Sequence, residues 1–330
     1  MKEWISKNQV LTFYILVFAI SWPCMIAIFN SSPENMPVQA LCGIIATFSP
    51  VLIALLISTI TKPQPKRDRS LSRWLVFLGG WMLSWGVLIL HTWQIREAAL
   101  DMSVIIPTAF VAILPGWLIS CACSRIPGVR ELFGTLLRPR GNVLWYLAAF
   151  LIVPAIQLLG AGITTLLGGS VESSVSDLSL GRVSVVIGVT FLNGFLISGG
   201  INEETGWRGF VLPRLQARYP VIVAVVIVWF FWALWHIPYD IGQDVPLESM
   251  LFNRIVLNFV WAVLAAWLYN RTNGSLLAPA IFHPAMNAFG DALPRTDTAT
   301  ILFLVLVVTV IIHDRMWEKL PSERLAVYSG

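Results

Sequence analysis

The sequence has 330 residues, of which 57% are hydrophobic and only 12% are charged, and its mean hydropathy is +0.75. Soluble globular domains contain roughly 25% charged residues, so this composition excludes an ordinary soluble protein and indicates a polytopic membrane protein. The net charge of +4 is small and gives no reason to expect a nucleic-acid partner, whereas a chain this apolar needs membrane lipid around it.

The apolar stretches, taken in chain order, predict an all-α transmembrane helical bundle. A helix needs about 20 apolar residues to cross a bilayer. By this measure we predict about ten spans, with eight as the alternative. The predicted spans lie near residues 10–29, 38–60, 74–93, 104–122, 143–167, 184–202, 220–237, 252–270, 275–290 and 299–313. We expect no cleavable signal peptide, because the first apolar run is too long for one and no A-x-A site follows it.

The distribution of basic residues predicts the orientation of the bundle. Of the 22 Lys and Arg residues, those in the odd-numbered loops and outer helix ends are Arg96, Arg182, Arg254 and Arg295. The other 18 lie at the termini and in the even-numbered loops, including the basic loop at 62–69. The outer loop at 239–248 carries acidic residues instead. Because basic residues concentrate on the cytoplasmic side, both termini are expected in the cytoplasm, in a protein of the cell (plasma) membrane.

Several reactive side chains are assigned to packing or to the membrane interface. The four cysteines are Cys24, Cys42, Cys121 and Cys123. All four fall in apolar runs, without the second Cys pair that a zinc site requires, so we interpret them as packing residues. His91 and His313 lie at the ends of predicted spans, where an imidazole ring reaches water.

Two adjacent carboxylates, Glu203 and Glu204, follow a hydrophobic run that begins near Val185. Ionisable residues at membrane depth are costly, so they indicate a functional site unless they are solvated at the end of a span. Arg208 follows Glu204 by four residues, and on a helix these two side chains can form an ion pair. That pair would leave Glu203 available for chemistry. The alternative is a solvated cytoplasmic cap of the span.

Two histidines in later spans have the residue types that complete a hydrolytic site. His236 ends an aromatic run at 228–236, and His283 lies one helical turn before Asn287. Each of these residues could instead be a buried polar group bonded to a neighbouring helix. Together with the carboxylates they offer a general base, an imidazole that holds water and N–H donors for an oxyanion, which is the chemistry of acyl-bond hydrolysis. The sequence contains no G-x-S-x-G or H-E-x-x-H motif.

Three motifs in this order resemble those of a known family. They are E-E-x-x-x-R at 203–208, an aromatic residue followed by x-x-x-H at 232–236, and H-x-x-x-N at 283–287. This pattern is similar to that of the CAAX-protease and bacteriocin-processing (CPBP or Abi) family of intramembrane proteases, whose archetype is the Ras-converting prenyl endopeptidase. The similarity covers roughly residues 185–290. Where the family has Phe, this chain has Trp232, and we expect that exchange to affect packing more than chemistry.

The resemblance implies an intramembrane endopeptidase that hydrolyses a peptide bond of a membrane-associated protein or peptide. The candidate catalytic residues are Glu203, Glu204, Arg208, His236, His283 and Asn287. By the resemblance, the first glutamate activates water that His236 holds, His283 and Asn287 stabilise the oxyanion, and the Glu204–Arg208 pair braces the site. It further implies a division into N-terminal transmembrane helices (1–183), catalytic helices (184–298) and a last span with a short cytoplasmic tail (299–330).

Several alternatives remain open at this stage. Members of the family are described both as metalloproteases and as metal-independent glutamate proteases, and Glu203, His236 and His283 would be the ligands of a divalent metal such as zinc. A non-catalytic membrane regulator or a bacteriocin self-immunity protein could use the same fold. A proton-coupled transporter is a third reading, although no internal repeat is visible. Prenylation of the substrate and the oligomeric state are left open.

Hydropathy alone places the candidate residues at different depths. Glu203 lies at the inner end of the sixth predicted span, whereas His236 lies about 18 residues, or ~27 Å of helix, from the start of the seventh. These residues can meet only if the segment 203–219 enters the membrane or the seventh helix starts lower. We therefore expect a recessed, cytoplasm-facing cavity, a short helix at 209–218, and bends at Gly199–Gly200 and Pro284.

Overall fold

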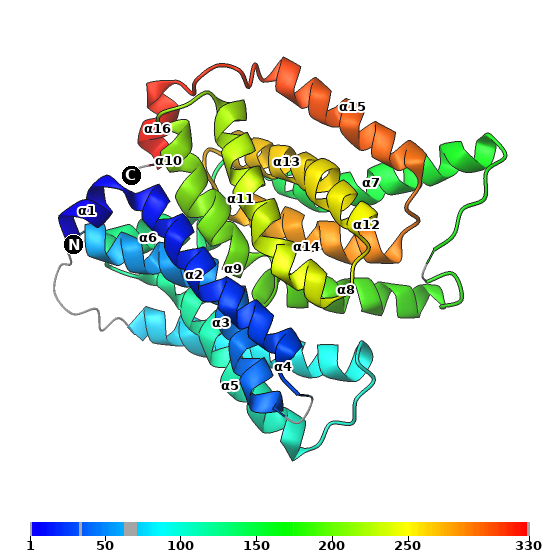
Figure 1. The fold of residues 1–330 in the computed structure, drawn as a ribbon, viewed down its shortest axis with the longest axis horizontal. Coiled ribbons are helices and arrows are strands. Elements are labelled where there is room, and N and C mark those ends of the chain that lie inside the picture. Colours follow the sequence, from blue (N-terminus) through cyan, green and yellow to red (C-terminus); the bar gives the residue numbers. More distant parts are fainter. Residues whose placement is uncertain (1, 33–34, 63–70, 174, 329–330) are drawn as a thin grey trace.

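The computed structural model describes residues 2–32, 35–62, 71–173 and 175–328 (Figure 1). In these residues every regular element is helical, which confirms the predicted all-α fold. Most of the basic loop at 62–69 lies outside the described residues.

The helices fall into two halves of the chain. The first half contains α1 (Lys2–Lys7), α2 (Gln9–Asn30), α3 (Met36–Thr61), α4 (Leu71–Gln94), α5 (Met102–Ser120), the 3₁₀ turn η1 (Cys121–Cys123), α6 (Pro127–Leu137) and α7 (Leu144–Leu166). The second half contains α8 (Leu180–Leu196), α9 (Ile201–Glu204), η2 (Thr205–Val211), α10 (Leu212–Gln216), α11 (Val221–Gly242), α12 (Leu247–Leu251), η3 (Phe252–Leu257), α13 (Asn258–Arg271), α14 (Leu277–Ala292), α15 (Asp297–His313) and α16 (Ser322–Tyr328). The elements η2 and η3 consist of wider, π-helical turns.

Eight helical segments in the described part of the chain are long and apolar enough to cross a membrane, judged by length and composition. The predicted count of ten is therefore not confirmed, and eight was the alternative. Helices do form where the ninth and tenth spans were predicted, but α14 has only 16 residues and α15 only 17. Helix α14 packs mainly against α7, α8 and α13, and also contacts α9 and α6, so protein surrounds it and it does not need a full lipid-facing length.

The α4–α5 hairpin lies at the periphery of the bundle (Figure 1). Large apolar side chains on α4, such as Leu75, Met82 and Leu83, are exposed, which suits a surface covered by lipid. The two helices approach closely at Gly116, where a Cβ atom would lie 2.6 Å from the backbone nitrogen of Trp81. Small residues at such contacts are typical of helix pairs in membranes, because without a hydrophobic driving force the association depends on close packing.

The sixth span is interrupted and then continues deeper than hydropathy predicts. After α8 ends at Leu196, the chain bends, with Gly199 at φ +110°, and resumes at Ile201. The amide oxygen of Asn202 accepts a hydrogen bond from the backbone N–H of Gly199 (2.8 Å), and its amide nitrogen donates to the carbonyl of Thr47 (2.9 Å). The predicted bend at Gly199–Gly200 is thus confirmed, and Asn202 ties it to α3.

This continuation brings Glu203 and His236 to similar depths. Glu203 lies 13 residues before the end of α10 at Gln216, and His236 lies 15 residues after the start of α11 at Val221. At 1.5 Å per residue, both lie roughly 20 Å of helix from the turn that joins the two elements. The predicted short helix at 209–218 is the last part of this longer helical segment.

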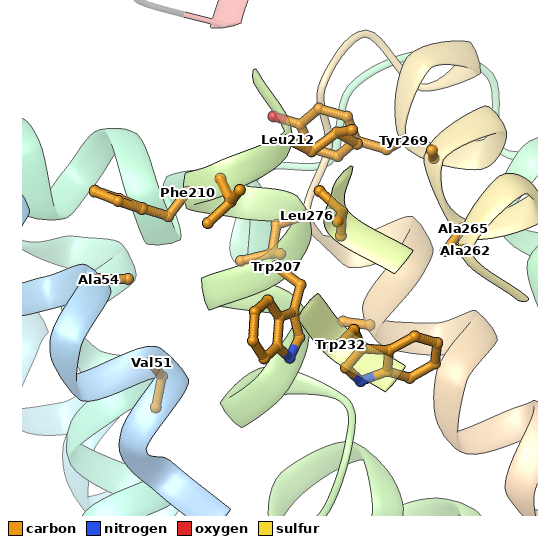
Figure 2. Packing of buried hydrophobic residues seen from close by; sticks show 14 of the residues in the cluster. Val51, Ala54, Trp207, Phe210, Leu212, Trp232, Ala262, Ala265, Tyr269 and Leu276 are labelled. Carbon is orange, nitrogen blue, oxygen red and sulfur yellow. The ribbon is translucent and has the colours of Figure 1, made fainter. Parts of the chain in front are cut away.

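The segment that follows the acids is buried by protein. Figure 2 shows Trp207, Phe210 and Leu212 on it, with Val51 and Ala54 of α3 on one side and α13 on the other. Both aromatic side chains are fully buried. A charged residue such as Arg208 lowers the hydropathy of this stretch, which is why the sequence alone ended the span near residue 202.

The two termini lie at the same end of the bundle (Figure 1). The chain after α15 packs beside the start of α11, where the backbone N–H of Val221 donates to the carbonyl of Glu318 (3.1 Å). An ion pair between Arg271 and Asp314 joins the ends of α13 and α15 at this end. We call it the inner end, and the opposite end, which carries the loops after α4, α7, α11 and α14, the outer end.

Candidate active site

The predicted site residues gather around one cavity of about 720 Å³. Four of them line it: Glu203, His236, His283 and Asn287. They come from α9, α11 and α14, so residues as far apart in the sequence as Glu203 and Asn287 line one cavity. The other two, Glu204 and Arg208, lie behind this wall and are each 1% exposed.

Glu204, Arg208 and His283 form a buried cluster that we call the brace. Oε1 of Glu204 accepts a hydrogen bond from Nη1 of Arg208 (2.9 Å) and lies 2.7 Å from Nδ1 of His283. The predicted ion pair between residues four apart on one helix is therefore present. Because a buried carboxylate needs compensating donors, the brace fixes Glu204 and orients the imidazole ring.

Glu203 is held by a single neutral donor. Its Oε2 accepts a hydrogen bond from the indole Nε1 of Trp232 (2.9 Å). The residue is 8% exposed and lines the cavity, whereas Glu204 does not. Adjacent carboxylates therefore differ in access, and Glu203 is the one that a molecule in the cavity can reach.

Trp232 connects the two sides of the site. Besides donating to Glu203, its ring lies 4.5 Å from the guanidinium carbon of Arg208, and its backbone carbonyl contacts His236. The sequence led us to expect that the exchange of Phe for Trp affects packing more than chemistry; the structure adds a hydrogen bond to Glu203 that Phe, which has no N–H, could not make. The signal was available in the sequence: a buried indole N–H usually finds a hydrogen-bond partner.

The hydrogen bond of His236 fixes its protonation pattern. Its Nδ1 lies 2.7 Å from the carbonyl oxygen of Trp232, which can only accept, so Nδ1 carries the hydrogen. In the neutral ring, Nε2 is then an acceptor, able to take a hydrogen bond from water. The ring also packs edge-on against Trp235, with the centroids 4.9 Å apart. His236 is thus rigidly oriented in the cavity wall.

The same argument applies to His283, with a different outcome. Its Nδ1 faces a carboxylate and so donates to Glu204, which leaves Nε2 as the second ring nitrogen. This nitrogen can donate to an oxyanion only when the ring is an imidazolium. A Cβ atom at Gly199 would lie 2.9 Å from Nε2, so the bend before the acids needs glycine there. Asn287, one turn later, brings an amide to the same cavity.

The three predicted metal ligands do not form a metal site. In the described residues, no group of three His, Cys, Asp or Glu side chains is arranged to hold a metal ion. His236 uses Nδ1 for the Trp232 carbonyl and His283 uses Nδ1 for Glu204. These hydrogen bonds leave both Nε2 atoms free, as in metal-binding histidines, so it is the spacing of the three side chains in the described residues that does not fit a zinc ion.

Sequence reasoning missed much of the remaining cavity wall. Arg254, on η3, binds Asp240 of α11 through two hydrogen bonds (2.6 and 2.5 Å), and both residues lie near the cavity mouth. Asn258 follows one turn later and also lines the cavity. Apolar side chains such as Trp261 and Phe303 complete the wall. The sequence signal that could have identified this part of the wall is an Asp and an Arg, Asp240 and Arg254, at the ends of two successive apolar helices.

The cavity extends to the outer end of the bundle. Its lining there includes Tyr239, Ser249 and Asp297, which lie at or beside the loops that follow α11 and α14. Among the described residues, none from the inner-end turns at 217–220 and 272–276 lines it. The predicted cytoplasm-facing cavity and the predicted cytoplasmic termini therefore conflict, because the cavity and the termini belong to opposite ends.

Comparison with known proteins agrees with the motifs. The family model described as "Type II CAAX prenyl endopeptidase Rce1-like" matches residues 184–289. The chain is also 30% identical over 185 residues to "CAAX prenyl protease 2" of Methanococcus maripaludis, a stretch that covers 52% of this chain and 67% of that protein. The matched region contains all six candidate residues and runs from within α8 to within α14.

Proposed function

Because this chain belongs to the CAAX prenyl protease family, we propose that it is an intramembrane endopeptidase that hydrolyses a peptide bond of a membrane-associated protein or peptide. The chain is a multi-pass integral membrane protein, and we assign it to the plasma membrane. The observation that carries the proposal is the convergence of Glu203, His236, His283 and Asn287 on one cavity of a size that holds a peptide segment with water.

In the first step, Glu203 acts as the general base. A water molecule bound between its carboxylate and Nε2 of His236 loses a proton to Glu203 as its oxygen attacks the carbonyl carbon of the substrate. The lone pair on Nε2 of His236 orients this water, since Nδ1 is committed to the Trp232 carbonyl. The indole N–H of Trp232 holds the carboxylate in position.

In the second step, the oxygen of the substrate carbonyl becomes an oxyanion. The amide N–H of Asn287 and, as an imidazolium, Nε2–H of His283 donate to it. The C–N bond then breaks, and the proton held by Glu203 passes to the leaving nitrogen, so that one water and one peptide bond become a carboxylic acid and an amine. Glu204 and Arg208 do not touch the substrate in this scheme; they position His283.

The proposal is tested with the purified full-length chain in lipid vesicles. The probes are two fluorogenic peptides that end in Cys followed by three residues, one farnesylated on that Cys and one not. Hydrolysis in water labelled with oxygen-18 should place one heavy oxygen in the new carboxylate. We expect cleavage to be abolished by Glu203→Ala and by His236→Ala and to survive a chelator. The matched control is Glu97→Gln, an exposed loop carboxylate, which should cleave normally.

Each outcome separates the alternatives. Cleavage of the farnesylated peptide alone makes the substrate a prenylated protein, and cleavage of both removes that requirement. Loss of cleavage on chelation overturns the metal-free mechanism. If neither peptide is cut, or if both alanine variants keep full activity, the endopeptidase proposal fails and a non-catalytic membrane regulator on this fold remains.

A further inference from the structure

Within the described residues, the cavity that holds the candidate catalytic residues extends to a mouth at the outer end of the bundle. Its lining runs from Glu203 and His283 to Ser249, Gly290 and Asp297. The last three residues flank the loops after α11 and α14. A substrate segment can therefore reach the carboxylate of Glu203 from that end.

The path from the inner end is filled by packed side chains. Trp207, Phe210 and Leu276 are 0–1% exposed and lie between Trp232 and the inner ends of α10 and α13 (Figure 2). A second pocket of about 300 Å³ does open near the inner end. It is lined by residues such as Lys62 and Arg214, and within the described residues the two linings have no member in common. The inner end thus gives no open route to the candidate site.

The charge distribution says which compartment each end faces. By chain position, 18 of the 22 Lys and Arg residues belong to the inner half, but Arg208 is buried in the brace and is uninformative. That leaves 17 against the four residues Arg96, Arg182, Arg254 and Arg295 at the outer end. Short loops with many Lys and Arg stay in the cytoplasm, so this bias places the inner end there.

We propose that the catalytic cavity opens on the extracytoplasmic side of the membrane and that its substrate is a peptide segment presented from that side. The statement about the substrate rests on the proposed function, whereas the orientation of the cavity does not. The apolar part of the wall, which includes Trp261, Met286 and Phe303, suits a segment with large apolar or lipid-modified side chains.

The orientation is tested by cysteine labelling in intact cells. The four native cysteines are all free, and each is replaced by alanine to give a background without thiols. Single cysteines are then introduced as Ser249→Cys at the cavity mouth, Ala99→Cys in the outer loop after α4, and Ala217→Cys in the inner turn after α10. All three positions are exposed. The reagent is a maleimide that does not cross membranes.

We expect S249C and A99C to be labelled in intact cells to the level reached after permeabilisation, and A217C to be labelled only after permeabilisation. The reverse pattern overturns the proposal. Labelling of A99C without S249C in intact cells also overturns it, because the outer end would then be external but the mouth closed. If the cysteine-free chain does not fold, fusions of green fluorescent protein and alkaline phosphatase to the C-terminus of the unmodified chain decide the orientation, with fluorescence expected and phosphatase activity contradicting it.

This experiment uses no catalysis, so it can fail independently of the proposed function. A chain labelled as expected but unable to cut any peptide retains the extracytoplasmic cavity and loses the protease proposal. A chain that cuts peptides but shows the reverse labelling retains the protease proposal and has a cytoplasmic substrate.

Discussion

The brace and the cavity wall use the same kind of side chain in opposite ways. In the brace, Glu204 is fully enclosed and meets a guanidinium and an imidazole. In the wall, the adjacent Glu203 has one indole N–H and faces open space. A carboxylate that already accepts from a guanidinium and from an imidazole N–H is a poor base, whereas one that accepts only an indole N–H keeps lone pairs for a proton.

The two glutamates have different surroundings because they project from different sides of the same helix. Successive residues on a helix are rotated by about 100°, so Glu203 and Glu204 project to different sides. One side meets α14 and the other meets the cavity. Glu203 can therefore act as a base while Glu204 stabilises the fold. The same substitution, Glu to Gln, tests the two roles separately.

The largest expected effect is on turnover in Glu203→Gln. The amide keeps the size of the side chain but cannot accept the proton from water, so kcat should fall about 10²–10⁴-fold, the usual contribution of a general base. The measurement is peptide cleavage in vesicles, accompanied by a thermal melt that should change by no more than a few degrees. A large drop in Tm would mean that Glu203 stabilises the fold, and the proposed difference between Glu203 and Glu204 would be wrong.

The same exchange in the brace should act mainly on stability. Glu204→Gln leaves the buried guanidinium of Arg208 without its counter-charge, and removing one partner of a buried ion pair costs about 3–5 kcal/mol. Denaturation in detergent should report this loss. The double variant Glu204→Gln with Arg208→Met removes both charges and should recover part of the stability; if it is less stable than the single variant, the ion pair is not the reason for the loss.

The third effect concerns the oxyanion. Asn287→Ala removes one proposed N–H donor from the cavity, and loss of one such donor typically lowers kcat about 10²–10³-fold. KM should change little, because the donor acts mainly in the transition state. Asn253→Ala is the matched control, since Asn253 also lines the cavity but has no assigned role in the reaction. Equal losses in both variants would show that the effect comes from the shape of the cavity.

The smallest effect is expected at the residue that joins the two regions. Trp232→Phe keeps an aromatic ring under Arg208 and removes the hydrogen bond to Glu203. The loss of a hydrogen bond to a charged group, about 1.5 kcal/mol, corresponds to roughly a tenfold lower kcat. A variant with unchanged kcat would mean that Trp232 serves packing alone, as the sequence suggested.

The candidate residues were found from the sequence because their signals are local or ordered. Glu204 and Arg208 are four residues apart, as are Trp232 and His236, and these spacings hold on any helix. The order of the three motifs indicated the family, and the comparisons confirm that resemblance. The boundaries drawn at 183 and 298 and the roles assigned to the residues stay predictions.

The number of spans and the depth of the site were harder to predict from the sequence, because hydropathy treats every helix as if lipid surrounded it. The segment after Glu203 was excluded from the sixth span by its charged residues, although protein covers the first of them, Arg208. Conversely, the stretch at 275–290 was counted as a span although α14 has 16 residues and is enclosed by its neighbours. Both errors have the same cause: burial by other helices replaces burial by lipid.

The sequence by itself determined that this protein is helical, lies in a membrane and brings two acids, two histidines and an asparagine to its C-terminal helices. The i, i+4 spacing of Glu204 and Arg208 already indicated that Glu203 is the available acid. Only the tertiary structure decided what holds Glu203 and at which end the cavity opens. The contacts that decide these points join residues 29 positions apart, as in Trp232 and Glu203, or 79, as in His283 and Glu204. Such contacts depend on the rotation and depth of each helix against its neighbours, which a one-dimensional pattern of apolar residues does not encode.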